Sequence, residues 1–389
     1  MAWTKLCCVS TAILHLADVH YGAAAGALPP ELAATLHRER LAALEAALRL
    51  ARERRAAAVL IAGDLIEARF AVREHAAALA AAFARCPVPV VVVPGNHDPA
   101  SPGSYYRTYP WPANVAVVAE ERWTRIDLPG ASVHALGWTG GALLGSPLGD
   151  LSLPRAAEPQ ILLLHADLDP PGGRSAYRPI SRAGLLATGA AYAALGHIHA
   201  PTLVTDGPRT VAAYPGSLTP LGFGEPGPHG ALWVEIGPEG ARAEPLALAP
   251  RSFRTMEIAC GEGWGPADVA AAARALPADF SRDLIRIRLV GASPAEPPQL
   301  DGLGWHVEVR DETEPAYDLD ALAAEDPRGL LARFIAAMRD LHDPSADAEV
   351  AATLEGDPDP DGTEPAPSAA ALALRYGVQA LTGRRLHPL

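Results

Sequence analysis

Three short apolar segments in the first hundred residues alternate with longer segments of helical character, and this alternation constrains the fold most. The apolar segments read TAILHL, AAVLIAGD and VPVVVV, at residues 11–16, 57–64 and 88–93. Leucines recur at near-helical spacing between the first two, and an alanine-rich helical segment precedes the third. Fully apolar strands that alternate with helices are typical of a sheet covered by helices. The first part of the chain is therefore predicted to form an α/β layer.

After Asn114 the pattern changes to shorter apolar segments with many glycines and few helical stretches. These segments predict a second, β-rich half. Together the two halves predict a four-layer α/β/β/α sandwich that ends near Ala249. The total of 389 residues is too long for one ordinary core, which indicates at least one smaller domain beside it.

The remainder of the chain divides by composition. Residues 251–341 contain alternating apolar and polar strand segments with helices between them, which predicts a small α+β accessory, or capping, domain. Residues 342–367 are rich in Pro, Asp, Glu and Ala and are expected to be an acidic linker. Residues 368–389 end the chain in a helical pattern. The resulting boundaries are 1–250, 251–341, 342–367 and 368–389.

The negative charge is concentrated late in the chain. The formal net charge is −13, and eight acidic residues without any Lys or Arg lie between Leu341 and Pro367. Removing these eight charges leaves −5 for the rest. This distribution argues against a uniformly basic nucleic-acid binder. The four cysteines show no metal-type pair spacing, which fits a cytoplasmic protein with free thiols, and no apolar run is long enough to span a bilayer.

Polar groups follow five of the apolar strand segments. They are Asp18, His20, Asp64, Asn96, His97, His165, His197 and His199. The carboxyl ends of strands in such sheets are where ligands gather. Alternate residues of a strand point to the same face, so each Asp-x-His or His-x-His pair could aim at one point if the extended conformation persists. Each motif alone would be an ordinary strand-to-loop turn, but five in series make coincidence a poor explanation.

The chemistry of these groups indicates a metal site. Aspartate, asparagine and histidine without cysteine suit divalent manganese, iron or zinc. A carboxylate can bridge two such ions, and paired ions serve displacement at phosphorus because they neutralise phosphoryl oxygens and activate water. The sequence therefore predicts a dinuclear-metal phosphodiesterase.

The same residues carry a family resemblance. The series Asp18-x-His20, Gly63-Asp64, Gly95-Asn96-His97-Asp98, His165 and Gly196-His197-x-His199 resembles the signature of calcineurin-like metallophosphoesterases. The segments ILHLADVHYG, ALGHIHAP and AYPGSLTPLGFGE are similar to sequences of the SbcD/YhaO-type DNA repair exonucleases. The resemblance covers residues 11–250 and extends weakly toward the C-terminus.

The resemblance implies roles for individual residues. Asp18, His20 and His199 would hold one metal ion; Asn96, His165 and His197 would hold the other, with Asp64 bridging. His97 would not be a ligand but would stabilise the transition state or protonate the leaving oxygen. The ions would be manganese, although the same ligands accept iron or zinc. Apart from the resemblance, Asp98 is expected to brace its loop or to orient a neighbour by hydrogen bonding. Glu67 stands where relatives commonly carry a histidine, which puts a phosphate contact there in doubt.

The resemblance also implies partners. The substrate would be DNA, cleaved as an exonuclease or endonuclease in repair, and the protein would act with an SbcC-like coiled-coil ATPase, since the chain has no phosphate-binding loop of its own. The helix around 372–386 would dock on that ATPase or pack on its own domain. Helix 31–54 would form a homodimer face or simply cover the sheet. Two other functions stay open: a phosphoesterase of small molecules or phosphoproteins, and a catalytically silent subunit that binds DNA ends.

Overall fold

The computed structural model describes residues 10–24, 28–149, 151–154, 156, 158–261, 263–291, 300, 302–313, 319–341 and 369–382. Their contacts divide the chain into two compact units, one of residues 1–221 with 228–250 and the other of residues 222–227 with 251–389. The predicted linker at 342–367 lies outside the described residues, as do the first nine residues.

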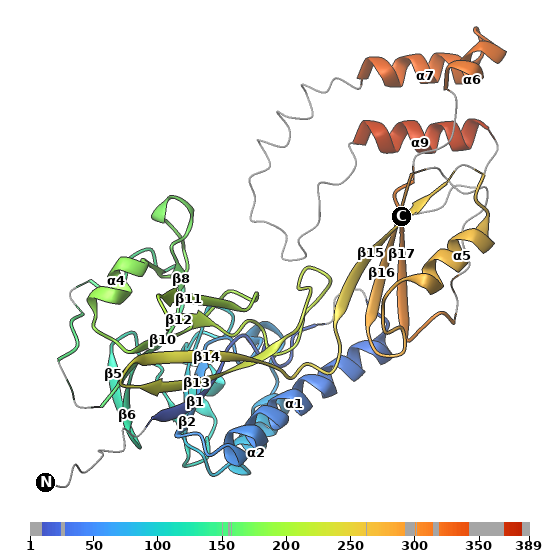
Figure 1. Cartoon of the computed structure of the whole chain (residues 1–389). Coiled ribbons are helices and arrows are strands. Elements are labelled where there is room, and N and C mark those ends of the chain that lie inside the picture. The colour runs from blue at the N-terminus through green and yellow to red at the C-terminus, as the bar shows by residue number, and fades with distance from the viewer. Residues whose placement is uncertain are drawn as a thin grey trace, which may run out of the picture. The chain divides into compact units, whose positions relative to one another are not determined.

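The first unit is built on a six-stranded mixed sheet with the strand order β14-β13-β1-β2-β3-β4. Strands β1 to β4 are parallel, and β13 runs antiparallel to both β1 and β14. The bounds are β1 (Thr11–Leu16), β2 (Ala58–Ala62), β3 (Val90–Val93), β4 (Val115–Val117), β13 (Gly230–Gly237) and β14 (Gly240–Ala247). The three strands predicted from the apolar segments are thus neighbours in this sheet. Figure 1 shows β13, β1 and β2 in this order.

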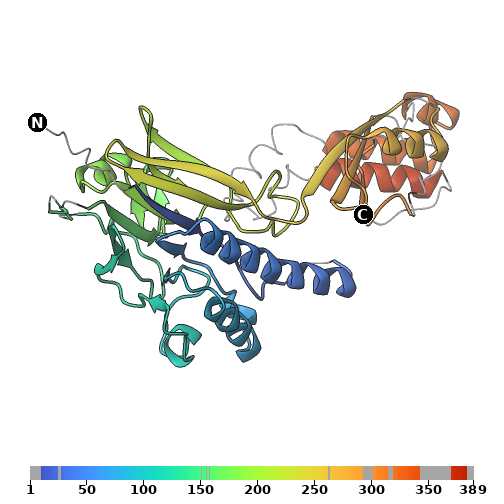
Figure 2. The same ribbon diagram turned by 60° about the horizontal axis from the view of Figure 1, so that its bottom comes forward.

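Two helices cover one face of this sheet, α1 (Pro30–Glu53) and α2 (Arg73–Ala84), and both lie on the same side of it in Figure 2. Helix α1 begins with proline, which suits the first helical position because its missing N–H has no partner there anyway. Its leucines and alanines recur on one face and pack with the outer residues of β1 to β3. One face of α1 therefore covers the sheet.

A second six-stranded mixed sheet faces the first, with the order β11-β12-β10-β7-β6-β5. Its inner strands are parallel and its two edge pairs antiparallel. The bounds are β5 (Thr124–Leu128), β6 (Ala131–Leu136), β7 (Gln160–His165), β10 (Tyr192–Gly196), β11 (Thr202–Asp206) and β12 (Arg209–Tyr214). Shorter elements complete the unit: α3 (Tyr105–Thr108), β8 (Asp167–Leu168), β9 (Pro179–Ile180) and α4 (Arg182–Ala187).

The two sheets enclose one apolar core. Inward-facing residues of both, such as Ile13, Leu60 and Leu163, are completely buried between them. His15 of β1 links the sheets, because its ring nitrogens lie 2.9 Å from the Tyr192 hydroxyl and 3.1 Å from the Leu195 carbonyl oxygen of β10. The outer face of the second sheet is covered in part by α4 through Leu185. The expectation of an α/β fold with two packed sheets is confirmed.

The second unit contains a three-stranded parallel sheet, β15 (Phe253–Cys260), β16 (Leu284–Gly291) and β17 (His306–Asp311), with α5 (Pro266–Ala275) packed on β15 (Figure 1). Its further helices are α6 (Leu319–Glu325), α7 (Leu330–Leu341) and α9 (Ala369–Leu381). Helix α9 lies against α7, where Gly377 leaves room for the ring of Phe334. The C-terminal helix thus has a partner within its own unit. None of the described helices is long and apolar enough to cross a membrane.

Candidate metal centre

Polar residues of the first unit converge where the central strands end, but not in the extended conformation considered from the sequence. Strand β1 ends at Leu16, and Asp18 and His20 have left-handed φ angles of 49° and 46°. Asp64 and His197 are also left-handed, with φ angles of 52° and 117°. The turns after β1 and β2 bond to each other, since the N–H of His20 donates to the carbonyl of Asp64 at 2.8 Å. These bonds bend both chains off their strands and gather the side chains.

The three residues predicted for the first metal ion come together. Ligand atoms of Asp18, His20 and His199 all lie within 4.8 Å of one another. The Nε2 atoms of His20 and His199 are 3.1 Å apart, and the His199 Nε2 is 3.9 Å from an oxygen of Asp18. Asp18 and His20 are buried, whereas the side chain of His199 is 27% exposed.

Of the residues predicted for the second ion, His165 and Asn96 are in direct contact through their side-chain polar atoms, whereas His197 is connected through a ring contact and its backbone N–H. The Nε2 of His165 lies 2.7 Å from the side-chain oxygen of Asn96. The ring of His197 meets that of His165 edge to face with centroids 5.3 Å apart, and its backbone N–H donates to Asp18. Asp64 lies between the two sets, because its Oδ2 is 3.7 Å from the His20 Nε2 and 3.5 Å from the His165 Nε2.

Hydrogen bonds to two of the imidazoles fit metal ligation. The Nδ1 of His165 donates to the backbone carbonyl of Ala62 at 2.9 Å, and the Nδ1 of His20 donates to Glu67 at 3.2 Å. Each neutral ring then presents the Nε2 lone pair to the centre, as metal-bound histidines do. The lone pair of His165 faces the oxygen of Asn96, so two acceptors point at each other, and a cation between them would turn this repulsion into attraction. The residues present therefore fit a divalent metal centre.

Burial sets the charge states of the site. Desolvation lowers the pKa of His20 and of His197 to about 4 and holds the pKa of His165 well below its usual range. Desolvation, followed by the charges of Asp98 and Asp18, raises the pKa of Asp64 well above its ordinary value. Neutral imidazoles and crowded buried carboxylates are what a bound cation stabilises, because its charge offsets the cost of burying the carboxylates.

Glu67 has a place in the site that the sequence did not reveal. Its Oε2 accepts hydrogen bonds from the Nδ1 of His20 at 3.2 Å and from the Nδ1 of His97 at 3.1 Å. Burial raises the pKa of Glu67, but the hydrogen bonds from the two imidazoles outweigh burial and lower this pKa to about 2. The hydrogen bond between His97 and Glu67 also raises the pKa of His97. The carboxylate thus orients both a candidate ligand and the candidate acid. Only its position three residues after Asp64 could have signalled this.

His97 and Asp98 occupy different environments. The side chain of His97 is 47% exposed, so a substrate can reach it, while its backbone N–H donates to Asp64 at 2.9 Å. Asp98 is buried and accepts hydrogen bonds from the backbone N–H groups of Asp64, Ile66 and Gly95 and from the Tyr106 hydroxyl. These hydrogen bonds support the first of the two roles expected for Asp98, that of bracing its loop.

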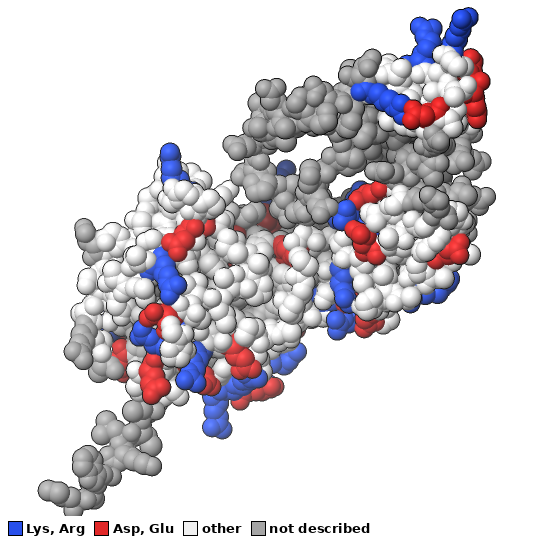
Figure 3. Space-filling view, turned by 45° about the horizontal axis from the view of Figure 1, so that its top comes forward, with Lys and Arg blue, Asp and Glu red and all other residues white. Residues whose placement is uncertain are grey.

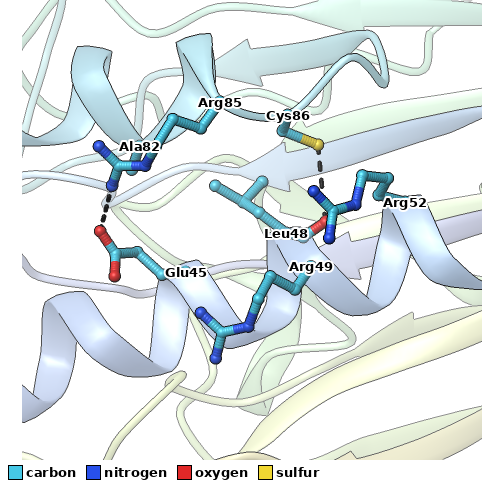
Figure 4. A pocket seen from close by; sticks show the side chains of 7 residues that line it. All are labelled: Glu45, Leu48, Arg49, Arg52, Ala82, Arg85 and Cys86. Carbon is cyan, nitrogen blue, oxygen red and sulfur yellow. Dashed lines mark hydrogen bonds and ion pairs between the residues drawn. The ribbon is translucent and has the colours of Figure 1, made fainter.

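A separate cavity of about 170 Å³ lies between α1 and the end of α2 (Figure 4). An ion pair between Glu45 and Arg85 and a weak bond from the Cys86 thiol to the Leu48 carbonyl tie the two helices together there. It contains none of the candidate ligands, being lined by Glu45, Leu48, Arg49, Arg52, Ala82, Arg85 and Cys86.

Comparison with known proteins identifies the domain. The family model described as calcineurin-like phosphoesterase matches residues 11–201, a range that contains every candidate ligand and His97. The chain is 29% identical over 310 residues to the DNA double-strand break repair protein Mre11 of Aeropyrum pernix, a match that covers 72% of this chain and 74% of that protein.

Two further relatives are more distant. The uncharacterized metallophosphoesterase YhaO of Bacillus subtilis is 27% identical over 241 residues, covering 60% of this chain and 58% of YhaO. The crystal structure of TT1561 of Thermus thermophilus is 15% identical with a TM-score of 0.37, covering 61% of this chain and 99% of that chain. Residues 11–201, just under half of the chain, thus match the calcineurin-like phosphoesterase family, and the candidate ligands all lie in that range.

Proposed function

We propose that the protein is a dinuclear-metal phosphodiesterase whose substrate is DNA. The observation that carries the proposal is the position of Asp64, with one carboxylate oxygen between His20 and His165 and the other accepting the N–H of His97. One residue thereby connects two ligand sets and the candidate acid. Asp18, His20 and His199 would hold one ion, and Asn96, His165 and His197 the other, with Asp64 bridging. When bound, the ions supply Lewis-acid activation of water and neutralise phosphoryl oxygens.

His97 is the proposed catalytic acid. Its Nδ1 donates to Glu67, which leaves the Nε2–H of the protonated ring for the leaving oxygen of the phosphodiester. The Glu67 carboxylate favours the charged ring, as the raised pKa of His97 indicates. The hydrogen bond to Asp64 holds the backbone of His97 in place. His97 is therefore fixed beside the proposed metal ligands without being one of them.

The choice of DNA rests on the relative named as a DNA double-strand break repair protein. The face in Figure 3 shows Lys and Arg interspersed with Asp and Glu among the described residues. DNA affinity depends on phosphate neutralisation by basic side chains, and acidic side chains stand among the basic ones on this face. A small-molecule phosphodiester, which needs no extended basic surface, is therefore the competing substrate class.

The test compares substrates and one variant. Protein loaded with Mn²⁺ would be assayed on linear duplex DNA, on bis-p-nitrophenyl phosphate and on a phosphomonoester. We expect cleavage of DNA and of the diester, and His97→Ala should lose about 10²–10⁴-fold in rate while retaining both ions. An unchanged rate in His97→Ala would contradict its role, and activity confined to the small substrates would exclude DNA.

We further propose an ATPase of the SbcC type as a partner, bound through the helices α7 and α9. Because α9 packs against α7, the pair forms one surface. A pull-down with the full chain and with a chain lacking residues 330–389, which removes both helices, tests this, since retained ATPase binding by the shortened chain would refute it.

A further inference from the structure

Arg178 is a buried cation behind the metal centre. It is 3% exposed, and burial lowers the pKa of its guanidinium to about 10. Its Nη2 donates to the carbonyl of Gly137 at 2.8 Å, whereas its Nη1 has no hydrogen-bond partner among the described residues. Burying an arginine costs free energy, so a buried arginine in a native structure calls for an explanation.

The guanidinium stacks on a tryptophan that touches the site. The Cζ of Arg178 lies 4.8 Å from the centre of the Trp138 ring, and Trp138 is 1% exposed. Trp138 in turn meets the ring of His165 edge to face with centroids 5.9 Å apart. Its backbone carbonyl accepts the N–H of Ala100 at 2.7 Å. Trp138 thus contacts His165 through its ring and the loop that carries Asn96 and His97 through its backbone carbonyl.

The backbone around Arg178 is held in an unusual conformation. Its φ angle is 55°, a left-handed value that is unfavourable for a non-glycine residue. Two hydrogen bonds keep it there, from its own N–H to the carbonyl of Leu143 at 2.8 Å and from the N–H of Asp167 to its carbonyl at 3.3 Å. The segment is therefore fixed so that the side chain reaches inward over Trp138.

We propose that Arg178 and Trp138 form a brace that fixes His165 and the Asn96 loop, which makes Arg178 a positioning residue for one of the two metal sites. The inference rests on the proposed dinuclear centre and adds a residue whose hydrogen bond and ring contact go to Gly137 and Trp138. The planar guanidinium is the essential part, because it stacks on the indole and donates to Gly137 at the same time. Lysine would keep the charge but neither the stack nor the fixed fork.

The test measures the two metal affinities separately. Metal-free protein would be titrated with Mn²⁺ by calorimetry, and the coupled dimanganese signal would be followed by electron paramagnetic resonance. Variants are Arg178→Gln, Arg178→Lys and Trp138→Phe. The control is Arg182→Gln, which removes an arginine of the same segment whose side chain is 45% exposed. We expect about tenfold weaker binding of one ion in the first three variants, with the other ion and the control unchanged.

The outcomes separate the brace from its premises. Both affinities within twofold of the parent in all three variants would overturn the brace, even if the melting temperature falls. The brace would also be overturned if Arg178→Lys bound both Mn²⁺ ions with parental affinity while Arg178→Gln bound one of them more weakly. The positive charge alone would then be sufficient. If one Arg178 variant does not fold, the other and Trp138→Phe decide. A parent protein that binds fewer than two Mn²⁺ ions would overturn the proposed function itself, and the brace with it.

Discussion

Both units contain parallel strands whose carboxyl ends meet at one edge, yet among the described residues candidate metal ligands gather at the edge in the first unit and not in the second. In the first unit, Asp18, Asp64 and His197 follow the strands in left-handed conformations. In the second, β15, β16 and β17 end at Cys260, Gly291 and Asp311, and no group of candidate ligands forms there among the described residues. The edge of a parallel sheet is thus not sufficient to make a site.

Backbone conformation accounts for the difference. Of the seven described non-glycine residues with positive φ, all lie in the first unit, and four of them are candidate ligands. Left-handed residues are costly unless the surroundings hold them, and such residues cluster at functional sites. In the second unit the polar residues of β16 instead stay on the exposed face, where Arg286 pairs with Glu308 and Arg288 with Glu312. Left-handed residues in the turns after the strands therefore distinguish the sheet that carries the candidate metal centre from the sheet of the second unit.

The largest effect is expected from disturbing one of these turns. Gly63 has a φ of 96°, and a Cβ there would lie 2.3 Å from the His165 Nδ1. We expect Gly63→Ala to displace His165 and lower phosphodiesterase activity by at least about 100-fold, since a shift of 1 Å in catalytic geometry has that effect. Hydrolysis of bis-p-nitrophenyl phosphate with Mn²⁺ measures it.

Gly103→Ala is the matched control for that change, because Gly103 has open space around the position of a Cβ. It should keep parental activity. Equal activities in the two variants would show that the turn after β2 does not set the site geometry.

A smaller loss is expected when the link between His20 and His97 is weakened. Glu67→Gln keeps the shape of the side chain but removes the charge that both imidazoles contact. We expect a 10–100-fold fall in kcat, the usual effect of removing a partner of metal-bound histidines. Glu74→Gln on α2 serves as the control. Parental kcat in Glu67→Gln would mean that the two hydrogen bonds are dispensable.

The buried His15 should make the first unit sensitive to acid. Desolvation lowers its pKa from 6.5 to about 3, so between these values the unfolded chain binds a proton that the folded chain does not. The stabilisation is complete above pH 6.5 and is lost as the pH falls, by about 1.4 kcal/mol per pH unit. Urea unfolding of metal-free protein from pH 8 to pH 5 should show a steeper decline for the parent than for His15→Gln. If the free energies of unfolding of the parent and of His15→Gln fell in parallel with pH, the lowered pKa of His15 would be contradicted.

The smallest effect is expected in the second unit. Arg288 pairs with Glu312 at 2.6 Å and with Glu257 at 3.7 Å, but its side chain and both partners are partly exposed. Because such pairs contribute about 0–1 kcal/mol, Arg288→Gln should change the free energy of unfolding by no more than that and leave phosphodiesterase activity unchanged. A large loss of activity would connect this sheet to catalysis and weaken the contrast between the units.

The sequence predicted the elements that have strong local patterns. The apolar run at residues 11–16 became β1 with the same bounds, and polar residues after β1, β2, β3, β7 and β10 lie near one another. The left-handed angles of Asp18 and His197 were not predicted, because hydrogen bonds between turns distant in sequence impose them. The role of Glu67 depends on two imidazoles at positions 20 and 97, and the stack of Arg178 on Trp138 joins residues 40 apart. Neither has a periodic pattern that a sequence could display.

The antiparallel pairing of β1 with β13 also bears on how the chain folds. Leu14 pairs with Trp233 on one side and with Val59 on the other, and His199 reaches a site that begins at Asp18. Contacts between such distant positions require closing long loops, which lowers the folding rate. Neither the first sheet nor the metal centre can be complete in a nascent chain before β10 to β13 have been made. We therefore expect this domain to fold slowly and late in synthesis, with β1 lacking a neighbour on one side until then.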